Sequence, residues 1–116
     1  MTLHLANITF DCDDALAVAR FWSAVLDRPL DAEPSEYFAS IGIGDMRDTS
    51  WLFAKVPEAK TVKNRVHVDL ASPAGAREDE VARLIGLGAK RLADKEEWGH
   101  RWTVMADPED NEFCVS

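Results

Sequence analysis

Two segments of this chain share one pattern, and this internal repeat constrains the fold more than any other feature. Residues 5–26, LANITFDCDDALAVARFWSAVL, alternate as a strand does and then continue with the spacing of an amphipathic helix. Residues 64–88, NRVHVDLASPAGAREDEVARLIGLG, repeat that order. Each half then ends in short apolar runs separated by turns. A repeat of about half the chain predicts two similar modules that pair to form one domain.

The modules are expected at about residues 1–58 and 62–116, joined by a short polar link. The elements expected in module one are a strand at 3–10, a helix from Asp13 or Asp14 to about Leu26, and strands at 30–33, 37–43 and 51–56. Those expected in module two are a strand at 65–71, a helix at 77–87, and strands at 91–95, 101–106 and 112–115. The fold class is therefore α+β, with two βαβββ modules forming a cup-shaped mixed sheet and the helices on its outer face.

Strand alternation predicts which side chains face the inside of the cup. Side chains expected beneath the helices are Ile8, Phe10, Val66, Val68 and Leu70. Those expected in the concavity are Asn7, Thr9, His67 and Asp69. A site between the modules would therefore receive different polar residues from each half.

Composition excludes several functional classes. The chain has 116 residues, of which 47% are hydrophobic and 29% charged, as is typical of a soluble globular domain. A net charge of −8 disfavours nucleic acids and anionic membrane surfaces as partners, and it permits a cationic ligand. No apolar run is long enough to cross a membrane and no secretory signal is recognised, so a cytoplasmic location is expected. Cys12 and Cys114 are expected as buried, unpaired residues within strands.

Three segments carry a resemblance to a known family. They are ARFWSAVL (19–26), KNRVHVDLASP (63–73) and WTVMADPEDNEFCV (102–115). With the repeat, they resemble the glyoxalase, bleomycin-resistance and extradiol-dioxygenase superfamily, also called the vicinal oxygen chelate superfamily, and in particular its small glyoxalase-like domain proteins. The last segment is similar to the family's closing hairpin, in which Asp110 stands where glycine is usual.

The resemblance implies a divalent metal in the concavity of the enzymes, held by His or Gln from each first strand and Glu from a last strand. In this chain the first-strand positions fall at His67 and at Asn7, or at Thr9 if the register is shifted by two. The last strand of module one has no carboxylate, and the glutamate position of module two falls at Cys114. We therefore expect no cofactor. A divalent metal held by His67, alone or with Asp69, Cys114 and Asn7, is the alternative.

The chain also offers a polar pair in the concavity. His67 and Asp69 lie two residues apart on one strand face, so the carboxylate could orient the imidazole. Such a pair suits general acid–base catalysis, and equally a hydrogen-bonded pair with no catalytic role.

The four tryptophans indicate an aromatic component. Trp22 lies on the apolar stripe of the first helix and is expected in the core. Trp51 shares a strand face with Phe53, and Trp102 lies on a later strand. Trp98, in the polar segment EEWGHRW, is expected at the rim of the cup, where it would stack on a planar or cationic ligand or cover a core edge.

Three functions remain. The first is a small-molecule-binding protein without the usual metal, which sequesters an antibiotic or metabolite through Asn7, Thr9, Trp51, Phe53, His67, Asp69, Trp98, Trp102 and Cys114. The second is a metal-dependent lyase, isomerase or dioxygenase with His67 as a ligand and Asp69 or Glu112 as its partner. The third is an accessory domain acting through a dimer surface. A homodimer is expected, with each cup formed within one chain or shared between two.

Overall fold

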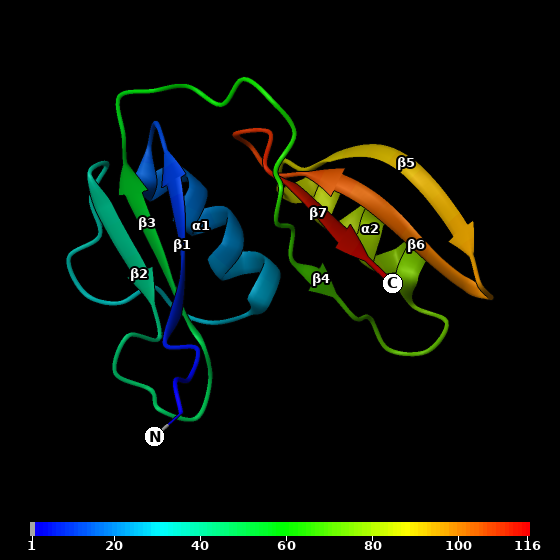
Figure 1. Cartoon of the computed structure of the whole chain (residues 1–116), viewed down its shortest axis with the longest axis horizontal. Coiled ribbons are helices and arrows are strands. Elements are labelled where there is room, and N and C mark those ends of the chain that lie inside the picture. Colours follow the sequence, from blue (N-terminus) through cyan, green and yellow to red (C-terminus); the bar gives the residue numbers. More distant parts are fainter. Residues whose placement is uncertain (1) are drawn as a thin grey trace. The chain divides into compact units, whose positions relative to one another are not determined.

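The computed structural model describes residues 2–116, which form two compact units that meet in sequence between Ala59 and Lys60. Unit 1 contains β1 (Asn7–Cys12), α1 (Ala15–Leu26), β2 (Phe38–Ile41) and β3 (Ser50–Lys55) (Figure 1). Unit 2 contains β4 (Asp69–Leu70), α2 (Arg77–Leu87), β5 (Lys90–Glu97), β6 (His100–Ala106) and β7 (Glu112–Val115). The predicted α+β class is confirmed.

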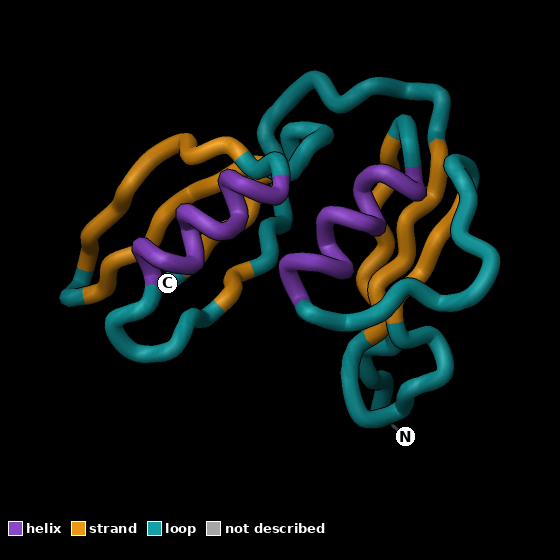
Figure 2. The backbone as a smooth tube through the Cα atoms, turned by 180° about the vertical axis from the view of Figure 1, so that it is seen from behind, coloured by secondary structure: helices purple, strands orange, loops and turns teal. Residues whose placement is uncertain are grey.

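The two units repeat one strand order. The sheet of unit 1 has the order β1-β3-β2, and the sheet of unit 2 has the order β4-β7-β6-β5. In each, the first strand runs parallel to the last, and the last pairs antiparallel with the strand before it. The strand expected at 30–33 is reduced to a single bridge between Leu30 and Ile41. Figure 2 shows one helix covering one face of each sheet.

Helix α1 follows from local sequence signals. The Asp14 carboxylate caps its N-terminus by accepting a hydrogen bond of 3.2 Å from the backbone N–H of Ala17. The stripe Val18, Phe21, Trp22 and Val25 is buried as predicted. Helix α2 has the predicted bounds and ends where Gly88 adopts a φ of 116°, a left-handed conformation that glycine accepts readily. Neither helix in residues 2–116 is long and apolar enough to cross a membrane.

Unit 1 has an aromatic core beneath α1. The Trp22 ring stacks on Trp51 with centroids 5.2 Å apart, and Phe10 contacts Trp22, Trp51 and Phe53 within 5.8 Å. The placement of Trp51 and Phe53 in a ligand site was therefore wrong, because both are buried. The parallel register pairs Ile8 with Trp51 and Phe10 with Phe53, so all four side chains share the helix-covered face.

Unit 2 differs from the expectation at its first strand. Only Asp69–Leu70 forms regular strand structure where residues 65–71 were expected, although the N–H of Cys114 also donates to the carbonyl of Val68. Val66 is 83% exposed, so its predicted burial beneath the helix was wrong. Val66 precedes the first residue that pairs with β7, and pairing with that strand is what fixes side chains over the core.

A tight turn joins β6 to β7 at residues 107–111. The buried Asp107 carboxylate accepts hydrogen bonds from the backbone N–H groups of Glu109 and Asn111 and from the Asn111 side chain, at 2.8–3.0 Å. Asp110 adopts a φ of 67°, a left-handed conformation that explains why glycine is usual at this place in similar hairpins. This turn fixes the register that aligns Cys114 with the pocket face.

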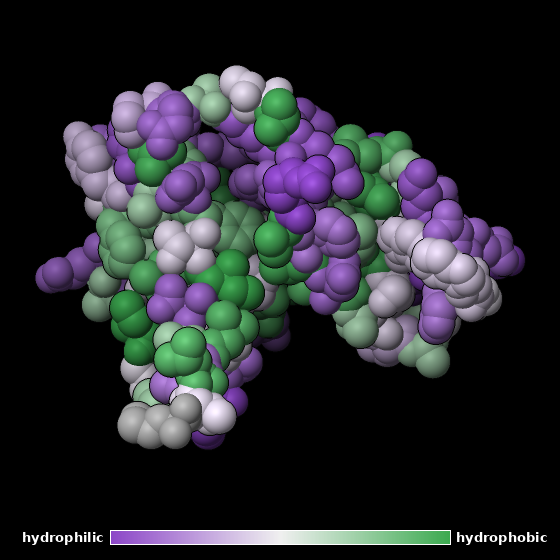
Figure 3. Space-filling view, viewed as in Figure 1, coloured by the Kyte–Doolittle hydropathy of each residue, from purple (hydrophilic) through white to green (hydrophobic). Residues whose placement is uncertain are grey.

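Outside their cores, the units expose different kinds of side chain. Figure 3 shows green hydrophobic residues mixed with purple ones over the open face of the unit 1 sheet. Over β5 and β6 of unit 2, the same view shows mostly purple hydrophilic and near-white residues. The open face of unit 2 is therefore the more polar of the two.

Candidate functional site

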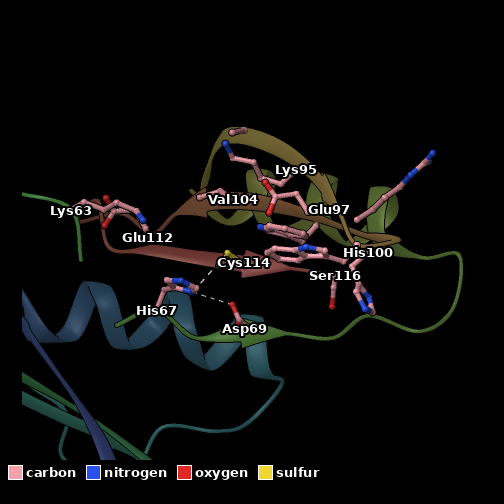
Figure 4. Close-up of a pocket in the computed structure, with 14 residues that line it drawn as sticks. Lys63, His67, Asp69, Lys95, Glu97, His100, Val104, Glu112, Cys114 and Ser116 are labelled. Atoms are coloured by element: carbon pink, nitrogen blue, oxygen red, sulfur yellow. Dashed lines mark hydrogen bonds and ion pairs between the residues drawn. The ribbon is translucent and has the colours of Figure 1, made fainter. Parts of the chain in front are cut away.

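A pocket of about 720 Å³ lies on the open face of the unit 2 sheet, opposite α2 (Figure 4). All four strands contribute to it, and alternate residues such as Ala93, Lys95 and Glu97 of β5 share its face. The lining residues are Lys63, His67, Asp69, Ala93, Lys95, Glu97, Trp98, His100, Arg101, Trp102, Val104, Glu112, Cys114 and Ser116. All of these lining residues belong to unit 2.

Five of the predicted site residues line this pocket: His67, Asp69, Trp98, Trp102 and Cys114. Two others, Asn7 and Thr9, lie exposed on β1 of unit 1, where the Asn7 amide donates a hydrogen bond of 3.1 Å to the Thr9 hydroxyl. The structure therefore brings together the predicted residues of module two.

His67, Asp69 and Cys114 form a cluster at the β4–β7 side of the pocket. The His67 Nδ1 atom lies 3.0 Å from Asp69 Oδ1 and 3.9 Å from Cys114 Sγ, as the dashed lines in Figure 4 mark. The parallel register places Asp69 directly beside Cys114. The imidazole, carboxylate and sulfur ligand atoms all lie within 4.8 Å of one another, a spacing that one metal ion could bridge.

The thiol of Cys114 is held in its neutral form. Burial is the main reason why its pKa is raised, and the charge and hydrogen bonding of Asp69 raise it further, while the Lys63 ammonium opposes them. A thiol with a raised pKa is a poor nucleophile and must lose a proton before it binds a metal. The environment of Cys114 therefore disfavours nucleophilic catalysis, and a metal ion would have to displace the thiol proton in order to bind.

Glu112, the alternative carboxylate partner of His67, is already bound to Asn64 and Lys60. Its Oε1 atom accepts a hydrogen bond of 3.0 Å from the backbone N–H of Asn64, and the Lys60 ammonium lies 3.1 Å from the same atom. Partial burial would raise the pKa of Glu112, but these two partners outweigh it and lower the pKa. Glu112 therefore fastens the chain segment that enters unit 2, and it stays charged near neutral pH.

The two tryptophans of the pocket come from the β5–β6 hairpin. Trp102 lies opposite Lys95 in the antiparallel register, so both side chains project from the same face. Trp98 and Gly99 form the turn, with φ values of 51° and 78°. Turns with two left-handed residues prefer Asn-Gly, and a bulky residue there costs about 1–3 kcal/mol. Trp98 is also 87% exposed, so neither burial nor backbone preference explains why a tryptophan occupies this position.

Sequence reasoning missed the charged side of the pocket. Lys63, Lys95, Glu97, His100 and Arg101 also line it. A strand as charged as KRLADKEE is typical of a solvated edge, and β5 is an edge strand of its sheet. The alternation of Ala93 and Lys95 could have indicated a shared face, but only the tertiary structure shows what this face encloses.

The repeat also settles which residue of unit 1 corresponds to His67. In both units the parallel pairing ends with the same hydrogen bond, donated by the backbone N–H that directly follows the last paired residue. Val56 donates to the carbonyl of Cys12, and Ser116 donates to the carbonyl of Leu70. With Asp11 beside Ala54 and Asp69 beside Cys114, the corresponding pairs are Thr9 with His67, Asp11 with Asp69, and Ala54 with Cys114. Thr9, rather than Asn7, therefore occupies the equivalent place.

Solved structures resemble the whole chain. A glyoxalase/bleomycin resistance protein/dioxygenase family enzyme from Burkholderia phytofirmans PsJN superposes with a TM-score of 0.78 at 20% identity, covering 97% of each chain. A mutant of the fosfomycin resistance protein FosX from Listeria monocytogenes, complexed with Mn(II) and 1S,2S-dihydroxypropylphosphonic acid, gives a TM-score of 0.79 at 12% identity. The alignment covers 99% of this chain and 90% of that one. The fosfomycin resistance protein FosX from Mesorhizobium loti gives a TM-score of 0.72 at 16% sequence identity. The alignment covers 99% of this chain and 91% of that one.

At these identities the structural likeness shows the fold alone. No curated protein matches the chain in sequence. The family described as glyoxalase-like domain matches residues 7–116, which include every element of both units. The chain therefore belongs to the glyoxalase-like domain family, within the vicinal oxygen chelate superfamily that its repeat and its closing hairpin indicate.

Proposed function

We propose that the protein binds a small organic molecule in the pocket of unit 2. The observation that carries the proposal is a concave site of about 720 Å³ with Trp98 and Trp102 in its lining. Sites for small molecules commonly enclose about 300–1,000 Å³ and combine apolar or aromatic walls with a few polar groups. Here the His67–Asp69 pair supplies polar atoms to the same lining as the indole rings.

The exposure of Trp98 supports this function. A large aromatic side chain left in water gains free energy when a ligand covers it, at about 25 cal/mol per Å² of apolar surface. Indole rings also stack on planar groups, which fixes the orientation of a ligand. Sequestration of an antibiotic or metabolite would need no more than such binding.

Thermal unfolding with a panel of planar natural products and antibiotics would test the proposal. A ligand at about 100 times its Kd should stabilise the protein by about 2.7 kcal/mol and raise its Tm. The double variant W98L/W102L should lose this effect. The matched control is Tyr37→Leu, which removes an exposed aromatic side chain from unit 1. No stabilisation by any compound, or full stabilisation of the double variant, would contradict the proposal.

A second function, metal-dependent catalysis, is supported by the His67–Asp69–Cys114 cluster. The cluster fits a borderline-soft ion such as zinc better than manganese, because it combines an imidazole and a thiol with one carboxylate. A bound ion would polarise an oxygen atom of the substrate. His67 and Cys114 would hold the ion, and Asp69 would orient the imidazole or complete the ligand set.

Elemental mass spectrometry of protein purified without chelators would test this second function. About one equivalent of zinc per chain is expected, and it should be lost in His67→Ala and Cys114→Ala. His100→Ala is the matched control, because His100 lines the same pocket outside the cluster. Protein that takes up no metal on titration would contradict the metal function and leave the binding function standing.

We also propose the homodimer and the cytoplasmic location that the sequence predicts for a protein of this kind. Light scattering would give the mass in solution, for which twice the chain mass of 12.9 kDa is expected. A mass near 12.9 kDa at micromolar concentration would contradict the dimer.

A further inference from the structure

Building on the small-molecule function proposed above, we infer that the ligand is a planar aromatic molecule that carries an anionic group such as a carboxylate. The juxtaposition of Lys95 and Trp102 in the pocket carries this inference. The two residues are direct cross-strand partners in β5 and β6, and both line the pocket. Side chains at such paired positions start about 5 Å apart, so one ligand can meet both.

The other charges of the pocket are largely committed. Asp69 is hydrogen-bonded to His67 at 3.0 Å, Glu112 forms an ion pair with Lys60 at 3.1 Å, and Arg101 forms one with Glu96 at 3.3 Å. By contrast, Lys63 and Lys95 form no ion pair with any residue from 2 to 116. The charged lining groups that have no hydrogen-bond or ion-pair partner in residues 2–116 are therefore the ammonium groups of Lys63 and Lys95 and the carboxylate of Glu97.

Glu97 is the one group that could reverse this preference. It lies two residues beyond Lys95 on the same strand, next to the hairpin turn, and it lines the pocket. Its cross-strand partner is His100, whereas Trp102 faces Lys95. A charged substituent on a ring stacked against Trp102 thus meets Lys95 first, and a cation there would be repelled.

The net charge of −8 does not bear on this pocket. Ten acidic and four basic residues lie in unit 1, whereas unit 2 holds eleven acidic and nine basic residues. Charges separated by more than about 8 Å are largely screened at physiological salt. The cationic ligand that the whole-chain charge permits therefore has less support than an anionic one, since the uncommitted lysines lie in the lining itself.

Three probes that share one ring system would test the inference by isothermal titration calorimetry. They are 2-naphthoate, 2-naphthylmethanol and 2-naphthylmethylammonium. We expect 2-naphthoate to bind about ten-fold more tightly than the alcohol, a difference of about 1.4 kcal/mol, and the ammonium probe to bind most weakly. Added salt should reduce the advantage of 2-naphthoate, because Lys95 is exposed.

Lys95→Gln should remove the advantage of 2-naphthoate over 2-naphthylmethanol and leave the affinity for the alcohol unchanged. Lys90→Gln is the matched control, because Lys90 lies on the same strand outside the pocket and pairs with Asp110. Equal affinities for the three probes, or tightest binding of the ammonium probe, would overturn the charge assignment while the small-molecule function stands. If none of the three probes binds, the assignment of an aromatic ligand is overturned. The small-molecule function itself would then be tested by thermal unfolding with the broader panel of natural products and antibiotics.

Discussion

The two units share a strand order but place their strand tryptophans, Trp51 and Trp102, on opposite faces of the sheet. In unit 1, Phe10, Trp22, Trp51 and Phe53 pack together beneath α1. In unit 2 the tryptophans line the pocket on the open face, while the buried core contains Val81 and Leu84 of α2 with Met105 and Phe113 of the sheet. One fold can therefore place its tryptophans in the core of one copy and in the lining of a pocket in the other.

Equivalent positions show the same division of roles. Where unit 2 has His67 and Cys114, unit 1 has Thr9 and Ala54, and only the unit 2 residues form a cluster able to hold a metal among residues 2–116. Repeated modules fold independently of which polar residues occupy their open faces, because those positions contribute little to the core. The repeat therefore predicts the architecture, and the differences between its copies indicate the site.

Tryptophan substitutions should give the largest contrast between the units. Trp22→Ala should lower the free energy of unfolding by about 3–5 kcal/mol, because it opens a cavity in the core of unit 1. Trp98→Ala should change it by less than about 0.5 kcal/mol, because the side chain is exposed. Urea unfolding would measure both values. Similar losses in the two variants would contradict the division into core and site tryptophans.

Glu112 offers a test of intermediate size, since its equivalent in unit 1 is an uncharged leucine, Leu52. Glu112→Gln should cost about 1–2 kcal/mol at pH 7, because a partly buried carboxylate loses charge-assisted hydrogen bonds. The folded pKa of Glu112 is lowered, so its contribution is present above the unfolded pKa and is lost as pH falls through the folded pKa. The difference in free energy of unfolding between Glu112→Gln and the wild type, measured by urea unfolding, should therefore disappear at acidic pH.

Exposed Glu58 in unit 1 supplies the control for that experiment. Glu58→Gln should leave stability unchanged at both pH values, because surface substitutions of this kind usually act within about 0.5 kcal/mol. A gap for Glu112→Gln that persists below the folded pKa would show that packing, rather than charge, is responsible.

A smaller effect is expected at the closing turn of unit 2. Asp110→Gly should stabilise the protein by up to about 1 kcal/mol, because glycine adopts a φ of 67° without the steric cost that a side chain brings. The lost ion pair with Lys90 is exposed and should matter little. Thermal unfolding would measure the change, and a clear decrease in Tm would show that Asp110 has a role beyond the turn.

The smallest effect concerns the reactivity of Cys114, measured in a Cys12→Ala background. The midpoint of alkylation against pH should lie above that of an ordinary thiol, because the pKa of Cys114 is raised. Asp69→Asn should move the midpoint down, since the Asp69 charge raises the pKa, and Lys63→Gln should move it up. Lys90→Gln should leave it in place. Unchanged midpoints in both Asp69→Asn and Lys63→Gln would contradict the geometry of the cluster.

Local signals predicted the helices well and the strand faces less well. Asp14 and Gly88 mark helix ends through their own backbone and side-chain chemistry, so the bounds of α1 and α2 agree with the prediction. The prediction placed Trp51 and Phe53 on the face of the ligand site, although they lie on the buried face. A strand alternates in the same way whichever of its faces a helix covers, so its pattern alone does not identify the buried face. Only the register with Ile8 and Phe10 decides between the two faces.

The sequence by itself determined the repeat, the α+β class, the family, and the His67–Asp69 pair two residues apart on one strand. The tertiary structure decided that Lys95, Trp102 and Cys114 meet in one pocket, and that Glu112 is already engaged by Lys60. The physical reason is that helices and turns are stabilised by neighbours in sequence, whereas a pocket on a sheet depends on pairings between distant strands. No local pattern specifies such pairings, and a shift of one residue would point every side chain to the other face.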